Sequence, residues 1–289
     1  MERQLWKIIS SCLTQLDRQV PKGDYEHSVG RIVRVYMWAV LHDRPVYWAC
    51  DRRNWVGVRP PKKLPDQSTM SRRLRREDTQ QMLNQLMERL DGSPVCSLLR
   101  YIDGKPLPVS KHSMDKQATF GRGAGGIDRG YKLHAIYGPG NRPLNWSVTP
   151  LNQSEQQTAR EMIDQRIGPG YLLGDANYDA NPLHEHAGRQ QVRLLTPRRY
   201  ARARSIGHCK HSAYRQDAIS RLLGPSDFVR SMLPLRRRIE TRFAHLTNFG
   251  GGLTGLPPWV RTLQRVRLWV HAKLIVRLAR DVCRRKGYA

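Results

Sequence analysis

The sequence is poor in acidic residues and lacks the features that mark secreted and membrane proteins. Its 289 residues include 24 Asp and Glu against 50 Lys and Arg, which gives a formal charge of +26. Its five cysteines are scattered and form no Cys-X-X-Cys pair, which argues against a disulfide framework. No apolar run approaches the roughly 20 residues that cross a bilayer, and the N-terminus lacks the apolar core of a signal peptide. We therefore expect a soluble protein in the reducing cytoplasm, with no membrane partner.

The excess of basic residues indicates a polyanionic partner, most simply a nucleic acid. Most of the cations are arginine, which can contact a phosphate through two parallel hydrogen bonds. Charge alone does not separate DNA from RNA, or an enzyme from a binding protein. A solvated basic surface and an RNA-binding protein of ribosomal type remain alternatives at this point.

The N-terminal region, residues 1–93, is predicted to be helical. Apolar residues between Ile8 and Leu16 recur at the spacing of a buried helix face, and residues 29–41 form a second apolar helix. Several prolines between Pro45 and Pro65 then interrupt the chain.

A basic helix is predicted to begin near residue 65, with Ser68 and Thr69 as caps, and to continue to about Gly92. Its start resembles the second helix of a helix-turn-helix, over residues 65–77, which enters the major groove of DNA. A solvated amphipathic helix that touches no ligand is the alternative. On the DNA-binding interpretation, the contacts come from Arg72, Arg73, Arg75 and Arg76.

Residues 94–289 have a different character, because strand-like runs alternate with helix-like ones. Three predicted strands are followed by a helix, a strand, a helix and a strand, and helices return from Arg215 onwards. The predicted strands are 95–102, 131–137, 144–149, 171–173 and 192–195, and the helices between them begin at Ser154 and Asn181. This order predicts an α/β fold of the RNase H-like type, in which a mixed sheet is flanked by helices. A glycine-rich stretch, 121–126, is interpreted as a flexible loop between strands.

Three acidic residues occupy positions suited to a metal site. Asp103 and Asp175 each follow a predicted strand beside a glycine, and Glu240 lies on a predicted helix within residues 235–246. If the two strands are neighbours, both aspartates can reach one ion, and a helix packed on the sheet can bring Glu240 to them. Such carboxylates can hold two Mg²⁺ ions that act on a phosphodiester. The alternative is that each acid is an ordinary turn or surface residue.

The stretches that carry these acids also resemble a known family. Together they are similar to the bacterial insertion-sequence transposases of the DDE type, which have an RNase H-like catalytic domain. The matching stretches are 101–105, 132–134, 144–150, 173–179 and 236–243, and 65–76 resembles the N-terminal DNA-binding region of such enzymes. The resemblance implies that Asp103, Asp175 and Glu240 are the catalytic acids and the ligands of two Mg²⁺ ions, for which Mn²⁺ can substitute.

The resemblance also implies contacts with DNA. Arg236 matches the arginine of the third signature and is expected to contact a phosphate near the cleaved end, together with Arg237, Lys132 and Tyr178. One branch of the family has a tyrosine and a lysine where this chain has Leu233 and Thr247. Either other basic residues make those contacts, or the chain belongs to a different branch.

The function implied by the resemblance is cleavage of DNA at the ends of a mobile element, followed by strand transfer into target DNA. The expected partner is double-stranded DNA, bound by a homodimer so that both ends are processed together. Two alternatives stay open: a catalytically silent DNA-binding protein derived from a transposase, and an RNase H-like nuclease without strand transfer.

Overall fold

The computed structural model describes residues 2–20, 25–91, 97–123, 125–164, 167–199, 211–224 and 231–287. The chain divides into two compact units. Unit 1 contains residues 1–92 and 245–289, and unit 2 contains residues 93–244. The sequence-based division into 1–93 and 94–289 differs from this at one end, because the C-terminal segment belongs with the N-terminal helices.

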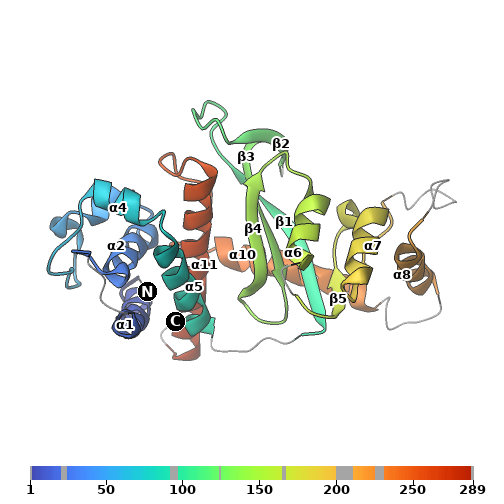
Figure 1. The fold of residues 1–289 in the computed structure, drawn as a ribbon, viewed down its shortest axis with the longest axis horizontal. Helices are drawn as coiled ribbons and strands as arrows, with labels where there is room; N and C mark the ends of the chain where they lie inside the picture. Colours follow the sequence, from blue (N-terminus) through green and yellow to red (C-terminus); the bar gives the residue numbers. More distant parts are fainter. Residues whose placement is uncertain are drawn as a thin grey trace. The chain divides into compact units, whose positions relative to one another are not determined.

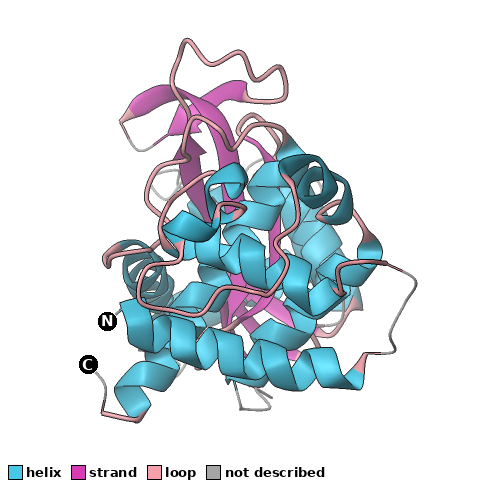
Figure 2. Ribbon diagram, turned by 90° about the vertical axis from the view of Figure 1, so that its left-hand side faces the viewer, coloured by secondary structure: helices cyan, strands magenta, loops and turns pink. Residues whose placement is uncertain are grey.

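Unit 1 is helical in its described part, as its helices in Figure 2 show. They are α1 (Glu2–Gln19), α2 (Val29–Leu41), α3 (Val46–Ala49), α4 (Gln67–Arg73), α5 (Glu77–Asp91) and α11 (Leu263–Arg285), with a 3₁₀ turn, η1 (Arg52–Asn54). Helix α11 packs on α1, α2 and α5. Trp6, Trp38 and Trp55 pack ring against ring in the core of this unit. No helix in the described ranges is both long and apolar enough to span a bilayer.

A buried lysine fastens α11 to the rest of unit 1. Lys273 donates hydrogen bonds to the carbonyl oxygens of Val40, at 3.0 Å, and Gly251, at 2.8 Å. Its third partner is the Asp43 carboxylate, at 2.6 Å. Because α2 ends at Leu41, the Val40 carbonyl lies in its last turn, where it accepts from the Asp43 amide at 3.2 Å and from this cation.

The predicted helix from Ser68 to about Gly92 is divided into α4 and α5, and the prediction of one continuous helix is wrong. The N-cap of α4 is Asp66, whose carboxylate accepts hydrogen bonds from the Thr69 amide, at 2.7 Å, and from the hydroxyls of Ser68 and Thr69. The two helices are separated at residues 74–76. Across this break the Thr79 hydroxyl donates a hydrogen bond to the Arg73 carbonyl at 2.8 Å. Asp66 is a stronger cap than the two hydroxyl residues because its charge also complements the helix dipole.

Unit 2 is built on a six-stranded mixed sheet, shown in Figure 1. The strands are β1 (Leu99–Pro108), β2 (Thr119–Gly123), β3 (Gly126–Tyr137), β4 (Pro143–Pro150), β5 (Gly170–Leu173) and β6 (Val192–Leu195). Their order is β2-β3-β1-β5-β6, with β4 also paired to β3. The helices are α6 (Glu155–Asp164), α7 (Asn181–Arg189), α8 (Ala213–Leu223) and α10 (Arg238–Thr247), with 3₁₀ turns η2 (Ala176–Tyr178) and η3 (Leu233–Arg237).

The pairing confirms the predicted fold class. Strands β1, β3 and β4 are antiparallel neighbours, and β5 and β6 add in parallel after the helical crossovers α6 and α7. The glycine-rich stretch predicted as a loop is instead largely a hairpin of β2 and the start of β3. Position 121 requires glycine because a Cβ there would lie 2.6 Å from the Leu151 carbonyl oxygen.

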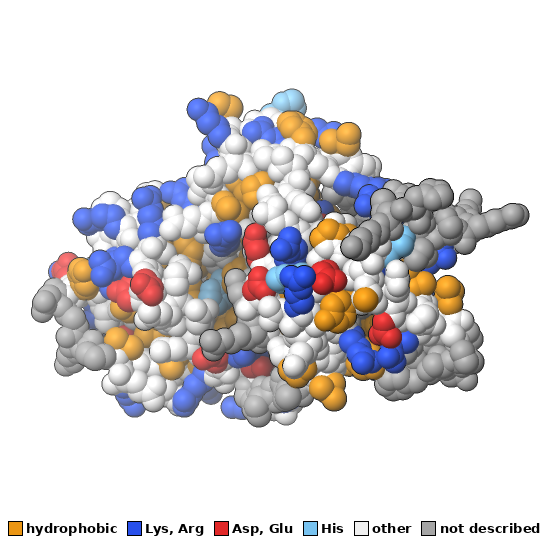
Figure 3. All heavy atoms as spheres, turned by 45° about the vertical axis from the view of Figure 1, so that its right-hand side comes forward, with side chains coloured by type: hydrophobic (Ala, Val, Ile, Leu, Met, Phe, Trp, Pro, Cys, Tyr) orange, Lys and Arg blue, Asp and Glu red, His pale blue; other side chains and the backbone are white. Residues whose placement is uncertain are grey.

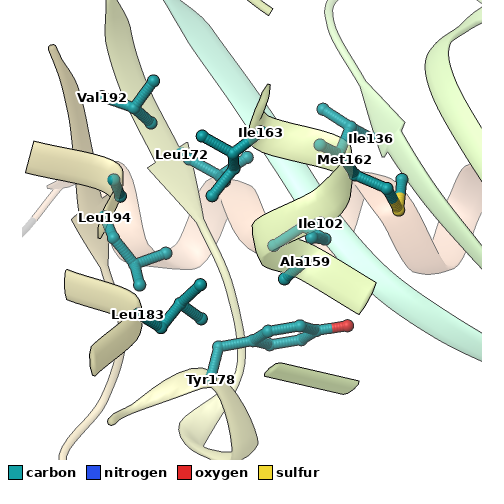
Figure 4. Close-up of a cluster of buried hydrophobic side chains, with 11 residues drawn as sticks. Ile102, Ile136, Ala159, Met162, Ile163, Leu172, Tyr178, Leu183, Val192 and Leu194 are labelled. Atoms are coloured by element: carbon teal, nitrogen blue, oxygen red, sulfur yellow. The ribbon is translucent and has the colours of Figure 1, made fainter. Parts of the chain in front are cut away.

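Helices cover both faces of the sheet. On one face, α6 and α7 bury a cluster that includes Ile102, Leu172 and Met162, drawn in Figure 4. Helix α10 lies on the other face, where Phe243 meets Tyr137 edge to face with ring centroids 6.3 Å apart. The sheet is therefore held from both sides, as buried mixed sheets of α/β proteins are.

Strand β1 is longer than predicted. Gly104 and Pro106 were expected to end it just after Asp103, but β1 continues to Pro108 and pairs with β3 throughout. Its pairing with β5 stops at Tyr101, which is opposite Leu173. Beyond Tyr101 one side of β1 is therefore free of a neighbouring strand in the described structure, and a strand with an open side tolerates proline.

Candidate active site

The register of β1 and β5 brings Asp103 and Asp175 to the same level. Tyr101 is opposite Leu173 in the parallel pair, and each aspartate lies two residues further along its own strand direction. Asp103 is still within β1, whereas Asp175 is the N-cap of η2 and accepts a hydrogen bond from the Asn177 amide at 2.9 Å. The two carboxylates thus stand beside the opening that the end of β5 leaves next to β1.

Burial and neighbouring charges disfavour ionisation of these two acids. Burial, together with the charges of Asp175 and Glu155, raises the pKa of Asp103 to about 6 against the opposing effects of the Gly104 amide and Arg236. Burial also raises the pKa of Asp175, and the charge of Glu155 raises it as well, whereas Arg236 lowers it. A cation bound between the carboxylates would remove this penalty. The pair is therefore suited to a positively charged ligand.

Glu240 occupies the more open side of this region. Its helix, α10, is tied to β1 by Arg238, which donates to the Tyr101 hydroxyl at 3.4 Å. The Glu240 side chain is 56% exposed, and its carboxylate lies 3.4 Å from the Arg236 guanidinium. Arg236 thus pairs with one of the three predicted acids and acts electrostatically on the other two. Direct convergence of Glu240 with the aspartates stays a prediction.

The structure adds a fourth acid that sequence reasoning missed. Glu155, the first residue of α6, pairs with Lys132 of β3 at 2.6 Å. Both side chains are largely buried, and Lys132, predicted to contact DNA, is 7% exposed. In the sequence, Ser154-Glu155 indicated only the start of a helix, so nothing local marked this pair.

Each aspartate is followed or preceded by a glycine, and the packing explains both. A Cβ on Gly104 would lie 2.9 Å from the Lys132 side chain and 3.3 Å from the Glu155 carboxylate. A Cβ on Gly174 would lie 3.0 Å from the ring of Tyr178. The glycines therefore leave room for the ion pair and for the tyrosine, in addition to shaping the backbone.

The tail of the second signature, Tyr178-Asp179, has two different roles in the structure. Tyr178 was predicted to contact DNA, but it is fully buried in the cluster between the sheet and α6 (Figure 4). Asp179 accepts hydrogen bonds from Arg215 of α8 at 2.7 and 2.8 Å and from the Arg199 amide at 2.9 Å. Burial opposes its ionisation, yet the hydrogen bonds from Arg215 and His184 hold the pKa of Asp179 below its usual range. Asp179 thus holds α8 next to η2, the 3₁₀ turn that follows Asp175.

The predicted DNA-contacting arginines of unit 1 fall into two groups. Arg72, Arg75 and Arg76 are exposed, as is Arg237 of η3 in unit 2. Arg73 is 6% exposed, donates to the His27 carbonyl at 2.9 Å and lies over the Tyr25 ring. On the face drawn in Figure 3, Lys and Arg side chains are spread among acidic ones rather than gathered in a single stripe. On this face the distribution of charge therefore does not mark a path for DNA.

The donor set at the aspartates fits a hard divalent cation, which takes oxygen ligands and keeps several waters. Within the described ranges, no group of three His, Cys, Asp or Glu side chains is close enough to hold a metal ion directly. Asp103 and Asp175 would thus be direct ligands, and other groups would act through water or after a local movement.

Comparison with known families identifies this arrangement. Residues 96–278, well over half of the chain, match the family described as Transposase DDE domain. The match covers β1, the N-cap of η2 and α10, which carry the three predicted acids. No curated protein and no solved structure matches the chain. The family match confirms the resemblance drawn from the acidic signatures: the chain belongs to the transposases with a DDE domain.

Proposed function

We propose that this chain is an active, metal-dependent DNA transposase that cuts the ends of its element and joins them to target DNA. Its family implies a transposition enzyme that acts on DNA. The observation that carries the proposal is the placement of Asp103 and Asp175 at one level, half-buried and with raised pKa values, beside an open side of β1. Half-buried carboxylates with raised pKa values are characteristic of sites that work on charged ligands.

Asp103, Asp175 and Glu240 hold the divalent ions, taken to be two Mg²⁺ with Mn²⁺ as a substitute. Bound ions supply activation of the attacking oxygen and stabilisation of the leaving one. In the first step, a water oxygen attacks the phosphorus at the element end, the bond from phosphorus to the 3′ oxygen breaks, and that oxygen leaves as a hydroxyl. In the second step, this 3′-hydroxyl attacks a phosphodiester of the target, so one such bond forms as another breaks.

Arg236 has the position to hold the phosphate during both steps. It acts on the two aspartates and pairs with the exposed Glu240, an interaction worth little in water. A DNA phosphate can replace Glu240 as its partner, which would free this carboxylate for a cation. Arg237, exposed beside it, adds a second positive charge for the backbone of DNA.

The proposed partner is double-stranded DNA, both element ends and target, in the cytoplasm. Two chains act together on DNA, because both ends must be cut and joined in one event. The exposed Arg72, Arg75 and Arg76 of unit 1 supply contacts with phosphates.

The experiment uses the full-length chain and a DNA fragment that carries the sequences flanking its reading frame. We expect cleavage that requires Mg²⁺ or Mn²⁺ and is lost in Asp103→Asn and Glu240→Gln, followed by joined products when target DNA is added. Asp217→Asn is the control, because it removes an exposed carboxylate of the same unit that pairs with Arg221 within α8. Cleavage without joining would indicate a nuclease, and binding without cleavage would indicate a silent DNA-binding protein. Unchanged cleavage by Asp103→Asn would refute the site.

A further inference from the structure

Glu155 faces the same space as the two aspartates. It lies at the first position of α6, and its carboxylate oxygen is 3.3 Å from the point where a Cβ on Gly104 would be. Gly104 is the residue directly after Asp103. The charge of Glu155 also acts on both Asp103 and Asp175. A third carboxylate is thus held close to a pair that already resists ionisation.

Lys132 fixes this carboxylate in place. The Lys132 ammonium lies 2.6 Å from one oxygen of Glu155, and the side chain of Glu155 is 19% exposed. Lys132 is opposite Pro106 in the pairing of β1 and β3, and Pro106 lies two residues after Gly104 on β1. A buried charge with its counterion costs less than an isolated one, yet such a pair is rarely better for stability than apolar side chains. Its position beside the aspartates therefore calls for a functional reason.

The Tyr178 hydroxyl gives independent evidence for a ligand. The ring is fully buried, and no hydrogen-bond partner for the hydroxyl exists among the described residues. Figure 4 shows the ring beneath Ala159, with the hydroxyl directed away from Leu183. The charges of Glu155, Asp103 and Asp175 all act on this phenol. A buried donor without a partner costs about 1–3 kcal/mol, so this hydroxyl points to a missing polar group.

We propose that Glu155 and Tyr178 bind the hydration shell of the divalent cation whose direct ligands include Asp103 and Asp175, with Lys132 holding Glu155 in position. This inference rests on the proposed metal-dependent function. An action through water agrees with the absence of a ready three-ligand group in the described ranges. Mg²⁺ and Mn²⁺ keep several waters when a few carboxylates bind them, and groups that orient such waters typically change metal affinity by about 10- to 100-fold.

The test measures Mn²⁺ binding to the full-length chain without DNA, by electron paramagnetic resonance of the free ion. We expect Glu155→Gln to weaken binding about 10-fold and Tyr178→Phe to weaken it several-fold. Glu161→Gln, on the same helix α6 but exposed, should bind Mn²⁺ like the wild type. Because the Tyr178 hydroxyl has no partner in the described structure, Tyr178→Phe should leave the melting temperature in EDTA unchanged or slightly raised.

The outcomes separate this inference from the proposed function. If Asp103→Asn weakens binding but Glu155→Gln and Tyr178→Phe bind Mn²⁺ like the wild type, the inference is wrong and the metal site stands. If Asp103→Asn also binds normally, both fail. A clear loss of stability in Tyr178→Phe in EDTA would show that the hydroxyl has a protein partner, and this result would also overturn its assignment.

Discussion

Replacement of Lys273 by methionine should destabilise unit 1 by about 3 kcal/mol. Methionine keeps most of the apolar contact of the lysine stem but removes all three hydrogen bonds of the buried ammonium. The Gly251 carbonyl then loses its donor, at about 1–3 kcal/mol, and the Val40 carbonyl, which keeps the Asp43 amide, loses one hydrogen bond of about 1 kcal/mol. Asp43 adds little, because its side chain is 46% exposed and water can replace the ammonium.

Urea unfolding followed by tryptophan fluorescence measures this effect in the right unit. Trp6, Trp38 and Trp55 pack together in the core of unit 1, so they report its unfolding. With a slope of about 2 kcal/mol per molar urea, the midpoint should fall by about 1.5 M. Lys7→Met makes the same chemical change at an exposed site on α1 and should leave the midpoint within about 0.3 M. A Lys273→Met midpoint equally close to the wild type would refute the reasoning.

Three further predictions concern the site and the basic helix. Asp103 has a folded pKa of about 6, above the value of an unfolded aspartate, so its contribution to stability is present below about pH 4 and is lost as pH rises to 6. In EDTA, the free energy of unfolding of the wild type should therefore fall by about 2 kcal/mol relative to that of Asp103→Asn between pH 4 and pH 7. The same pH dependence of this free energy in both proteins would contradict the pKa shift. Asp179→Asn should weaken its bidentate pair with Arg215 and speed hydrogen exchange in α8, whereas unchanged exchange would show that α8 is held by other contacts. Arg72→Ala should lower DNA affinity, measured by fluorescence anisotropy, in a salt-dependent manner and without loss of stability. Arg73→Ala should lower the melting temperature, measured by thermal unfolding. The reverse result for the two variants would contradict the burial of Arg73.

The order of strands and helices in unit 2 was predictable because its signals are local. The strands at 170–173 and 192–195 are short apolar runs, and the helix between them, α7, starts with a proline in its first turn. The extension of β1 past Gly104 was not predictable, because it depends on where the pairing with β5 stops. Proline and glycine are unfavourable in a strand with neighbours on both sides but tolerated where one side is open.

The candidate site divides in the same way. Asp103 and Asp175 could be found from an acid beside a strand end, a pattern confined to a few residues. The Lys132–Glu155 pair joins a strand and a helix through two residues that are 23 positions apart in the sequence, and no motif links one residue to the other. Arg73 looked like its exposed neighbours in a basic run, and only the packing of Tyr25 and His27 around it reveals a different role.

The composition of unit 1 has a consequence for the way the chain is made. Its helices come from both ends of the sequence, and residues 93–244 form a separate compact unit in between. During synthesis, α1, α2 and α5 leave the ribosome long before α11, which covers apolar surface on all three. Domains generally fold as units as they emerge, so unit 2 can form while unit 1 still waits for its last helix. A nascent chain that stops before residue 263 would carry Asp103, Asp175 and Glu240 but an incomplete helical unit, exposed to chaperones and proteases.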